Sequence, residues 1–196
     1  MMLAQIRTVL FDLDGTLTVP LIDFDALRAR LDLPAGVPLL HALAPLPEER
    51  RVHGMQVIHQ AEIEAAHNAV ANTGAIELVA DLAARGIATA IVTRNSTDAS
   101  RITLARLKIN VDVLVTRDFL PTKPAPAPVL EALRLLRAKP AGALMVGDYA
   151  DDIAAGRAAG TLTCLVTNGS GPPRFDADLH VPYPRDLHEL FAQAWG

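Results

Sequence analysis

Apolar strand-like segments alternate with helix-like segments along most of this chain of 196 residues. Strands are predicted at residues 9–11, 87–93, 111–116, 143–146 and 161–166, with an edge strand at 179–181. Helices are predicted at residues 76–85, 97–107 (capped by Ser96), 126–138, 152–159 and 186–194. This alternation is typical of a parallel sheet covered by helices. The sequence therefore predicts an α/β fold.

Residues 18–75 interrupt the alternation, because they contain no convincing strand. Helices are predicted at residues 24–31 and 48–70, where Gly54 would be able to divide the second into two, and residues 72–74 form a stop signal. The Pro- and Gly-rich stretch between them has no assigned helix. We expect a core domain made of residues 1–17 and 76–196, and an inserted helical cap of residues 18–75 over the site.

Composition limits the classes of function. Hydrophobic residues make up 51% of the chain, enough for a core, and the net charge of −4 argues against a nucleic-acid partner. The single cysteine, Cys164, lies in an apolar run, so no internal disulfide is expected and a reducing compartment fits. Neither a signal peptide nor a membrane span is recognisable. We expect a soluble, cytoplasmic protein without a membrane partner; the sequence does not predict its oligomeric state.

Two carboxylates follow the first predicted strand. Asp12 and Asp14 come directly after the apolar run 9–11 and before Gly15. Ligands bind at the carboxyl ends of strands in open α/β sheets, and side chains two residues apart on an extended chain point the same way. Close carboxylates repel each other and favour a cation, of which Mg²⁺ is the natural choice. The alternative, a solvated Asp-x-Asp turn, loses weight because three further strand ends carry matching groups.

The second and third of these ends carry a hydroxyl and a lysine. Thr93 ends a strand, and its hydroxyl, with the N–H groups at the start of the next helix, is able to hold phosphoryl oxygens. As an alternative, Thr93 is only a turn or cap residue. Lys123 lies in a Lys-Pro-Ala-Pro loop, which positions it more firmly than an ordinary surface lysine.

The fourth end carries Asp148, which follows an apolar strand and Gly147. Asp148 would complete a Mg²⁺ site. Asp152 lies at the start of the next helix, where an acid either joins the site or only caps the helix. Acid, hydroxyl, lysine and acid at four strand ends make a specific signal when they occur together.

With these four motifs the chain resembles the haloacid dehalogenase-like hydrolase superfamily, and specifically its phosphoglycolate-phosphatase-like group with a helical cap. The resemblance extends over essentially all of the chain. It rests on Asp12-Leu13-Asp14-Gly15-Thr16, Thr93, Lys123 in Lys-Pro-x-Pro, and Gly147-Asp148-Tyr149-Ala150-Asp151-Asp152. The resemblance implies a Rossmann-like parallel sheet and Mg²⁺-dependent hydrolysis of small phosphate monoesters.

The resemblance also implies a role for each motif residue. Asp12 would be the nucleophile that forms an aspartyl-phosphate, and Asp14 the general acid and base. Thr93 would bind the phosphoryl group, and Lys123 would offset its charge. The implied Mg²⁺ ligands are Asp12, the backbone carbonyl of Asp14, and Asp148, while Asp152 would support the metal's waters or Lys123.

The second motif departs from the familiar hydroxyl-Asn pair, because Arg94 stands between Thr93 and Asn95. Arg94 and Asn95 are candidate substrate-binding residues, although Arg94 is equally able to point away. In the cap, the histidines at 53, 59 and 67 do not have the i, i+4 spacing of two ligands on one helix face. We therefore expect no metal site there.

Within the superfamily that the chain resembles, two sequence features help to distinguish between the possible reactions. Asp14 favours phosphoryl chemistry over dehalogenation, and the lack of a lysine in residues 18–75 argues against a phosphonoacetaldehyde hydrolase. A phosphatase acting on a small phosphorylated metabolite is the leading hypothesis. A sugar phosphomutase and a non-catalytic binding protein with the same fold stay open, since the first shares all four motifs and the second is not excluded by residue identity.

Overall fold

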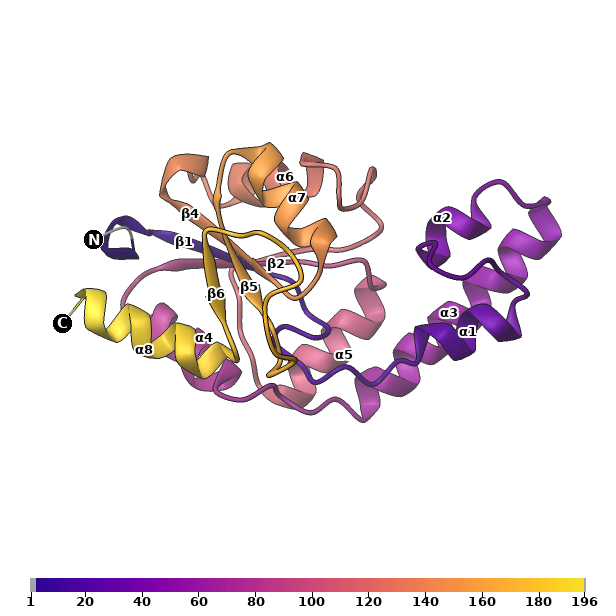
Figure 1. Ribbon diagram of the computed structural model, residues 1–196, viewed down its shortest axis with the longest axis horizontal. Coiled ribbons are helices and arrows are strands. Elements are labelled where there is room, and N and C mark those ends of the chain that lie inside the picture. The colour runs from indigo at the N-terminus through magenta and orange to yellow at the C-terminus, as the bar shows by residue number, and fades with distance from the viewer. Residues whose placement is uncertain (1–2, 196) are drawn as a thin grey trace.

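Six strands form one sheet in the computed structural model, which describes residues 3–195 (Figure 1). Every neighbouring pair is parallel, and the order across the sheet is β3-β2-β1-β4-β5-β6. The strands are β1 (Thr8–Phe11), β2 (Ala88–Val92), β3 (Val113–Val115), β4 (Ala143–Gly147), β5 (Leu162–Val166) and β6 (Leu179–Val181). The predicted α/β fold with a parallel sheet is confirmed.

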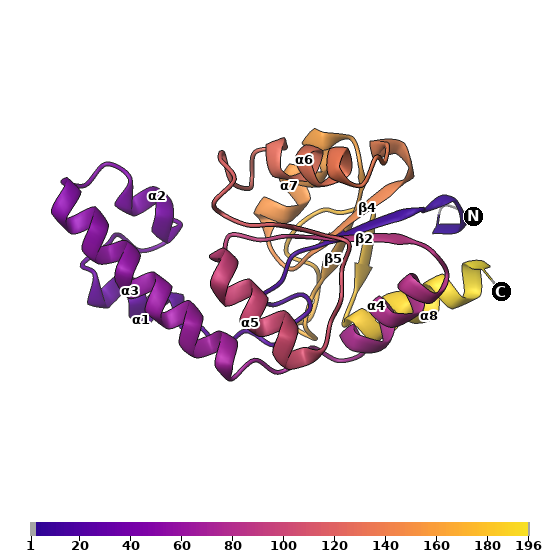
Figure 2. The ribbon, with the colours of Figure 1, turned by 180° about the vertical axis from the view of Figure 1, so that it is seen from behind.

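Helices cover both faces of this sheet (Figures 1 and 2). On one face lie α4 (Ala75–Ala84), α5 (Thr97–Leu107) and α8 (Pro184–Trp195). On the other face lie α6 (Ala127–Leu135) and α7 (Ala150–Ala159). Short 3-10 turns, η1 (Leu3–Gln5) and η2 (Pro140–Gly142), precede β1 and β4. The sheet is thus enclosed except at its strand ends.

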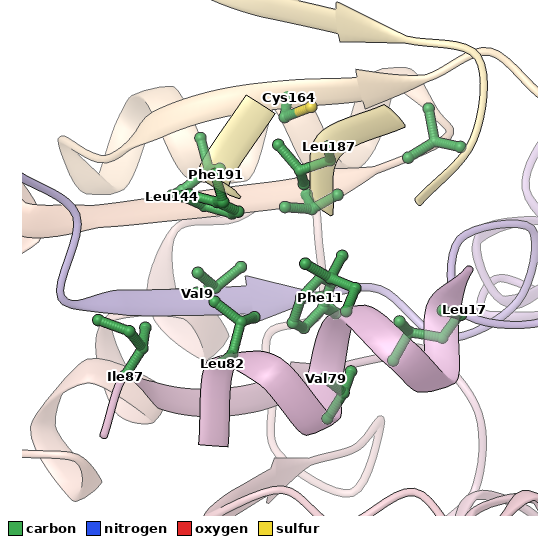
Figure 3. Packing of buried hydrophobic residues seen from close by; sticks show 14 of the residues in the cluster. Val9, Phe11, Leu17, Val79, Leu82, Ile87, Leu144, Cys164, Leu187 and Phe191 are labelled. Carbon is green, nitrogen blue, oxygen red and sulfur yellow. The ribbon is translucent and has the colours of Figure 1, made fainter. Parts of the chain in front are cut away.

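The central strand β1 is buried on both faces, as expected when helices cover a parallel sheet. Val9 and Phe11 point into the larger cluster, where Leu82 of α4 and Phe191 of α8 pack (Figure 3). Leu10 points into the opposite cluster with the side chains of α6 and α7. This packing holds β1 rigidly, and the residues that follow Phe11 therefore leave the sheet at a defined place.

Three helices lie between β1 and α4: α1 (Phe24–Arg30), α2 (Leu39–Leu43) and α3 (Glu48–His67). They enclose an apolar cluster of their own, which includes Leu39, Leu43 and Ile58. In Figures 1 and 2, α1 and α2 stand away from the sheet and α3 leads back towards α5. The division of the chain into a core and a cap of residues 18–75 stays a prediction that this arrangement supports.

Several element boundaries differ from those expected. α3 is one continuous helix that ends at His67, because Gly54 does not break it; instead its missing side chain leaves space for Leu43 of α2. α2 was not predicted from the sequence, since its five residues are too few to show a helical period. α7 begins at Ala150, so Asp152 lies within its first turn. No helix within residues 3–195 has the length and apolar character needed to cross a membrane.

Candidate functional site

The loops after β1, β2, β3 and β4 meet at one edge of the sheet and line a cavity of about 480 Å³. Because the strands are parallel, their carboxyl ends lie on the same side, and the order of the sheet places β1 between β2 and β4. Residues of α1, α2 and α3 line the opposite wall. All the site residues predicted from the sequence line this cavity: Asp12, Asp14, Thr93, Arg94, Asn95, Lys123, Asp148 and Asp152.

Three carboxylates lie together at the bottom of the site. One oxygen from each of Asp12, Asp148 and Asp152 lies within 4.8 Å of the others, and within residues 3–195 this is the one such group of potential metal ligands. Three carboxylates in one place suit a hard cation such as Mg²⁺. The side chain of Asp14 is not in the group. A Mg²⁺ ligand from that residue would have to be its backbone carbonyl.

Burial and neighbouring charges change the pKa of two of these acids, Asp12 and Asp148. Burial raises the pKa of Asp12 to about 6, although Lys123 opposes the shift. Burial, together with the charges of Asp12 and Asp152, raises the pKa of Asp148 to about 8. A cation placed among the three carboxylates would reverse both shifts, because it favours the charged forms.

Lys123 provides the positive charge inside this group. Its side chain is 2% exposed, and its Nζ donates to Asp12 Oδ1 at 2.7 Å and to Asp152 Oδ1 at 2.6 Å. Burial alone would lower the pKa of Lys123, but the two carboxylates outweigh burial and raise that pKa above its usual value. Lys123 is therefore charged and holds Asp12 in a fixed orientation.

Asp152 has both of the roles that the sequence left open. One oxygen accepts from Lys123, and the other accepts from the backbone N–H of Tyr149 at 3.1 Å, just before α7. Gly147 makes this possible, since a Cβ at that position would collide with the Asp152 side chain. The capping bond and the lysine bond together leave Asp152 little freedom to move.

Asp14 is held by two other polar side chains. Its Oδ2 accepts from Asn95 Nδ2 at 2.7 Å, and its Oδ1 accepts from Thr18 Oγ1 at 3.1 Å. Thr93 is buried, and its Oγ1 accepts from the backbone N–H of Asn95 at 3.2 Å. The structure thus brings the first and second motifs into direct contact through Asn95.

Arg94 does not carry a free charge into the cavity. Its Nη1 donates to Asp151 Oδ2 at 2.6 Å, and its side chain is 35% exposed. The sequence left open whether Arg94 reaches an anionic group or points away. The structure places it beside the site and pairs it with an acid of the chain itself.

One charged pair that includes a cavity residue, Glu62 with Arg117, was not predicted from the sequence. Glu62 of α3 lines the cavity, forms an ion pair with Arg117 after β3, and accepts the backbone N–H of Ser96 at 3.2 Å. The available signal was helical periodicity, because Glu62 lies four residues from both Ile58 and Ala66 on one buried face. An acid on such a face implies a buried partner.

Several other arginine and histidine side chains of the helical segment are exposed to solvent. Arg50 and Arg51 are exposed, and Arg50 Nη2 donates to the carbonyl of Leu31 at 3.2 Å. His53 and His67 are exposed and lie outside the cavity lining, whereas His41 of α2 is exposed and lines it.

Comparison with known proteins gives a consistent family relationship. A family model described as haloacid dehalogenase-like hydrolase matches residues 6–160. A haloacid dehalogenase-like hydrolase domain-containing protein of Arabidopsis thaliana is 32% identical over 185 residues, which cover 87% of this chain and 76% of that protein. The pyrophosphatase PpaX of Bacillus cereus is 36% identical over 181 residues, which cover 83% of this chain and 84% of PpaX.

Solved structures share the fold. The structure of a predicted phosphoglycolate phosphatase from Haemophilus somnus superposes with a TM-score of 0.75 at 21% identity, covering 95% of this chain and 98% of that one. At this identity the similarity extends to the fold alone.

Proposed function

The chain belongs to the haloacid dehalogenase-like hydrolase family, and from that premise we propose that it is a Mg²⁺-dependent phosphatase acting on small phosphate monoesters. One observation carries the proposal. The buried Lys123 ammonium orients the Asp12 carboxylate, and Asp14, two residues further along the chain, lines the same cavity. A nucleophile, a cation and a second acid at one point are what phosphoryl transfer to an aspartate requires.

The phosphoryl group would bind between the core loops. Lys123 would attract its charge, and the Thr93 hydroxyl and Asn95 amide would donate to its oxygens, since all three line the cavity. Arg94 would contribute a further positive charge at the edge of this site, reduced by its pairing with Asp151.

In the first step, Asp12 attacks phosphorus and the bond from phosphorus to the leaving oxygen breaks. Asp14 gives its proton to that oxygen, so an alcohol leaves and Asp12 carries the phosphoryl group. Asn95 and Thr18, which hold the Asp14 carboxylate at 2.7 Å and 3.1 Å, would keep it aimed at the leaving group.

In the second step, water attacks the same phosphorus from the opposite side and Asp14 accepts a proton from it. The bond between phosphorus and Asp12 breaks, and phosphate leaves with Asp12 regenerated. The net reaction consumes one ester and one water and releases one alcohol and one phosphate.

The three-carboxylate group would hold the metal, with Asp12 and Asp148 as ligands and Asp152 at its side. The carboxylate oxygens fit this role by number and chemistry. When bound, Mg²⁺ would neutralise charge on the phosphoryl oxygens. Asp152 would hold Lys123 in place beside the metal ligands, because its two oxygens are already engaged by Lys123 and the Tyr149 N–H.

The name of one relative supports phosphoryl chemistry, because PpaX, which is 36% identical over 181 residues, is described as a pyrophosphatase. For this chain we propose a small phosphorylated metabolite as substrate. A cytoplasmic location is also proposed, since the one cysteine is free and buried in β5, which fits a reducing compartment.

The test is phosphate release from a panel of small phosphate esters with and without Mg²⁺. Asp12→Asn should lower turnover by about 10⁴-fold or more while the midpoint of urea unfolding changes little. The matched control is Asp23→Asn, the same chemical change at an exposed cap of α1, where Asn caps as well as Asp. Near wild-type turnover of Asp12→Asn would exclude it as the nucleophile. Mg²⁺-independent turnover would exclude the metal, and isomerised product without phosphate release would indicate a mutase.

A further inference from the structure

We propose that the cavity beside the phosphoryl site accepts an uncharged, largely apolar alcohol group. The preferred substrates would then be phosphate monoesters of apolar alcohols, in place of carboxylated esters, polyol phosphates or pyrophosphate. This inference rests on the proposed phosphatase function and defines its substrate class.

The wall opposite the catalytic loops is mainly apolar. It is formed by the segment after β1 and by α1, α2 and α3. Its larger apolar side chains are those of Leu21, Ile22, Phe24, Leu39, Leu40 and Ile58. Such a wall offers few hydrogen bonds to the hydroxyl groups of a sugar, and each hydroxyl buried against it without a partner weakens binding.

Two large side chains on this wall are exposed to the cavity and the solvent beyond it. Leu21 is 47% exposed and Phe24 is 43% exposed. Exposed apolar side chains that gather at a cavity mark a surface that gains free energy when a ligand covers it. An apolar ligand group would remove both from water.

The core supplies an aromatic surface at the same cavity. Tyr149, after β4, lines the cavity and is 50% exposed. Its ring meets Phe175 edge-to-face, with 5.5 Å between ring centroids and an interplanar angle of 71°. Phe175 therefore fixes the ring orientation of Tyr149. The exposed part of Tyr149 is available to an apolar or aromatic group attached to a phosphate held next to Asp148.

The cationic side chains at this cavity already have partners within the chain. Arg28 of α1 donates to Asp25 Oδ1 at 2.6 Å and to the carbonyl of Val37 at 3.0 Å. Arg94 is paired with Asp151. Among the described residues that line the cavity, the remaining lysine or arginine is Lys123, which faces Asp12 and Asp152. A carboxylate or second phosphate on the leaving group would lack a free cation.

The two acids on this wall are likewise paired, because Glu62 binds Arg117 and the Ser96 N–H, and Asp25 binds Arg28. A sugar hydroxyl would have to compete with these partners. His41 of α2, which is exposed, leaves room for one hydrogen bond to one polar group of the ligand. The cavity of about 480 Å³ is in the range of small-ligand sites.

The test compares esters with similar primary alcohol leaving groups, so that the chemical step is alike and only the body of the substrate differs. n-Butyl and benzyl phosphate are measured against glycerol 3-phosphate and phosphoglycolate, with pyrophosphate as a further arm. We expect kcat/KM for the apolar esters to exceed that for the others by about tenfold or more.

One variant and its control test whether the preference for apolar esters comes from the apolar wall. Phe24→Ala should lower kcat/KM for benzyl phosphate about tenfold and change that for glycerol 3-phosphate much less. Val52→Ala is the matched control, since Val52 is 49% exposed on α3 and lies outside the cavity lining. It should change neither value.

Preference for phosphoglycolate, pyrophosphate or glycerol 3-phosphate would overturn the inference while leaving the phosphatase proposal intact. An equal loss for all esters in Phe24→Ala would also overturn it. If no ester were hydrolysed, the phosphatase proposal would fail. The ranking of dissociation constants for the same esters on Asp12→Asn, measured by calorimetry, would then decide the inference: equal binding of all of them contradicts it.

Discussion

Glu62 on α3 and Arg117 after β3 form a buried ion pair between the helical segment and the sheet domain, although 55 positions separate them in the chain. Their side chains are 5% and 9% exposed. Glu62 also accepts the N–H of Ser96, and Arg117 Nη1 donates to the carbonyl of Arg94 at 3.4 Å. The helical segment is therefore tied to the loop that carries Thr93 and Asn95.

This pair leads to a first prediction. Glu62→Ala should lower the free energy of unfolding by about 3 kcal/mol, because it leaves the Arg117 charge buried without its partner. Adding Arg117→Met should recover part of the loss, since no unpaired charge is then buried. Urea unfolding of the two single variants and the double variant measures the coupling. Strictly additive losses would show that the two residues do not depend on each other.

The second prediction concerns Lys123. Lys123→Met removes the cation between Asp12 and Asp152 and should cost about 3–5 kcal/mol of stability when no metal is present. Because a divalent cation would replace part of the lost charge, Mg²⁺ should restore stability more in Lys123→Met than in the wild type. Thermal unfolding with EDTA and with Mg²⁺ measures this. Equal stabilisation of both proteins would argue that Lys123 and the metal do not share the same carboxylates.

The third prediction concerns the metal itself. A ligand that binds only the folded state stabilises it by about 2.7 kcal/mol at one hundred times its dissociation constant. Mg²⁺ should therefore raise the unfolding temperature of the wild type, and Asp148→Asn should largely lose this response. Asp176→Asn is the matched control, because Asp176 is exposed and paired with Arg157 away from the cavity. An unchanged Mg²⁺ response in Asp148→Asn would remove Asp148 from the proposed metal site.

The fourth prediction concerns pH. Burial raises the pKa of the Cys164 thiol from 9.0 to about 12. The unfolded thiol ionises first as pH rises, which favours the unfolded state. This contribution to stability is complete below pH 9 and is lost as pH rises towards 12. Relative to its value at pH 7, the wild type should lose about 1.4 kcal/mol more than Cys164→Ala at pH 10.

Denaturant unfolding of both proteins at pH 7 and pH 10 measures this difference. The cavity left in Cys164→Ala lowers stability by the same amount at both values of pH, so it cancels. Parallel losses in the two proteins would mean that Cys164 ionises as readily in the folded as in the unfolded state. In the native protein at pH 7, a thiol reagent should fail to modify Cys164, which is 0% exposed.

Much of the fold could be predicted from local sequence patterns. The strands of the sheet are short apolar runs, and Ser96 begins α5 as its side chain predicts, accepting the N–H of Ala99. Such features depend on neighbours in the chain, so the sequence contains their cause. The helix α2 was missed for the converse reason. Its five residues are held by packing of Leu39 and Leu43 against Ile58, a contact distant in sequence.

The candidate site also contains features that the sequence predicted and features that it left open. The sequence identified Asp12, Asp14, Lys123 and Asp148 as a set, because each follows a strand and parallel strands end at one edge. It left open whether Asp152 caps a helix or joins the site, and the structure shows one oxygen in each role. It also left open where Arg94 points, and Asp151 holds it.

By itself, the sequence determined the α/β class, the elements of the sheet and the residues that gather at its edge, since these depend on periodicity and on the order of strands. The tertiary structure alone decided which charges of remote segments meet. The pairings of Glu62 with Arg117 and of Arg94 with Asp151 depend on how α3 and α7 lie around the cavity. Side-chain pairing is decided over a few ångströms, and local sequence patterns do not specify distances of that size between elements remote along the chain.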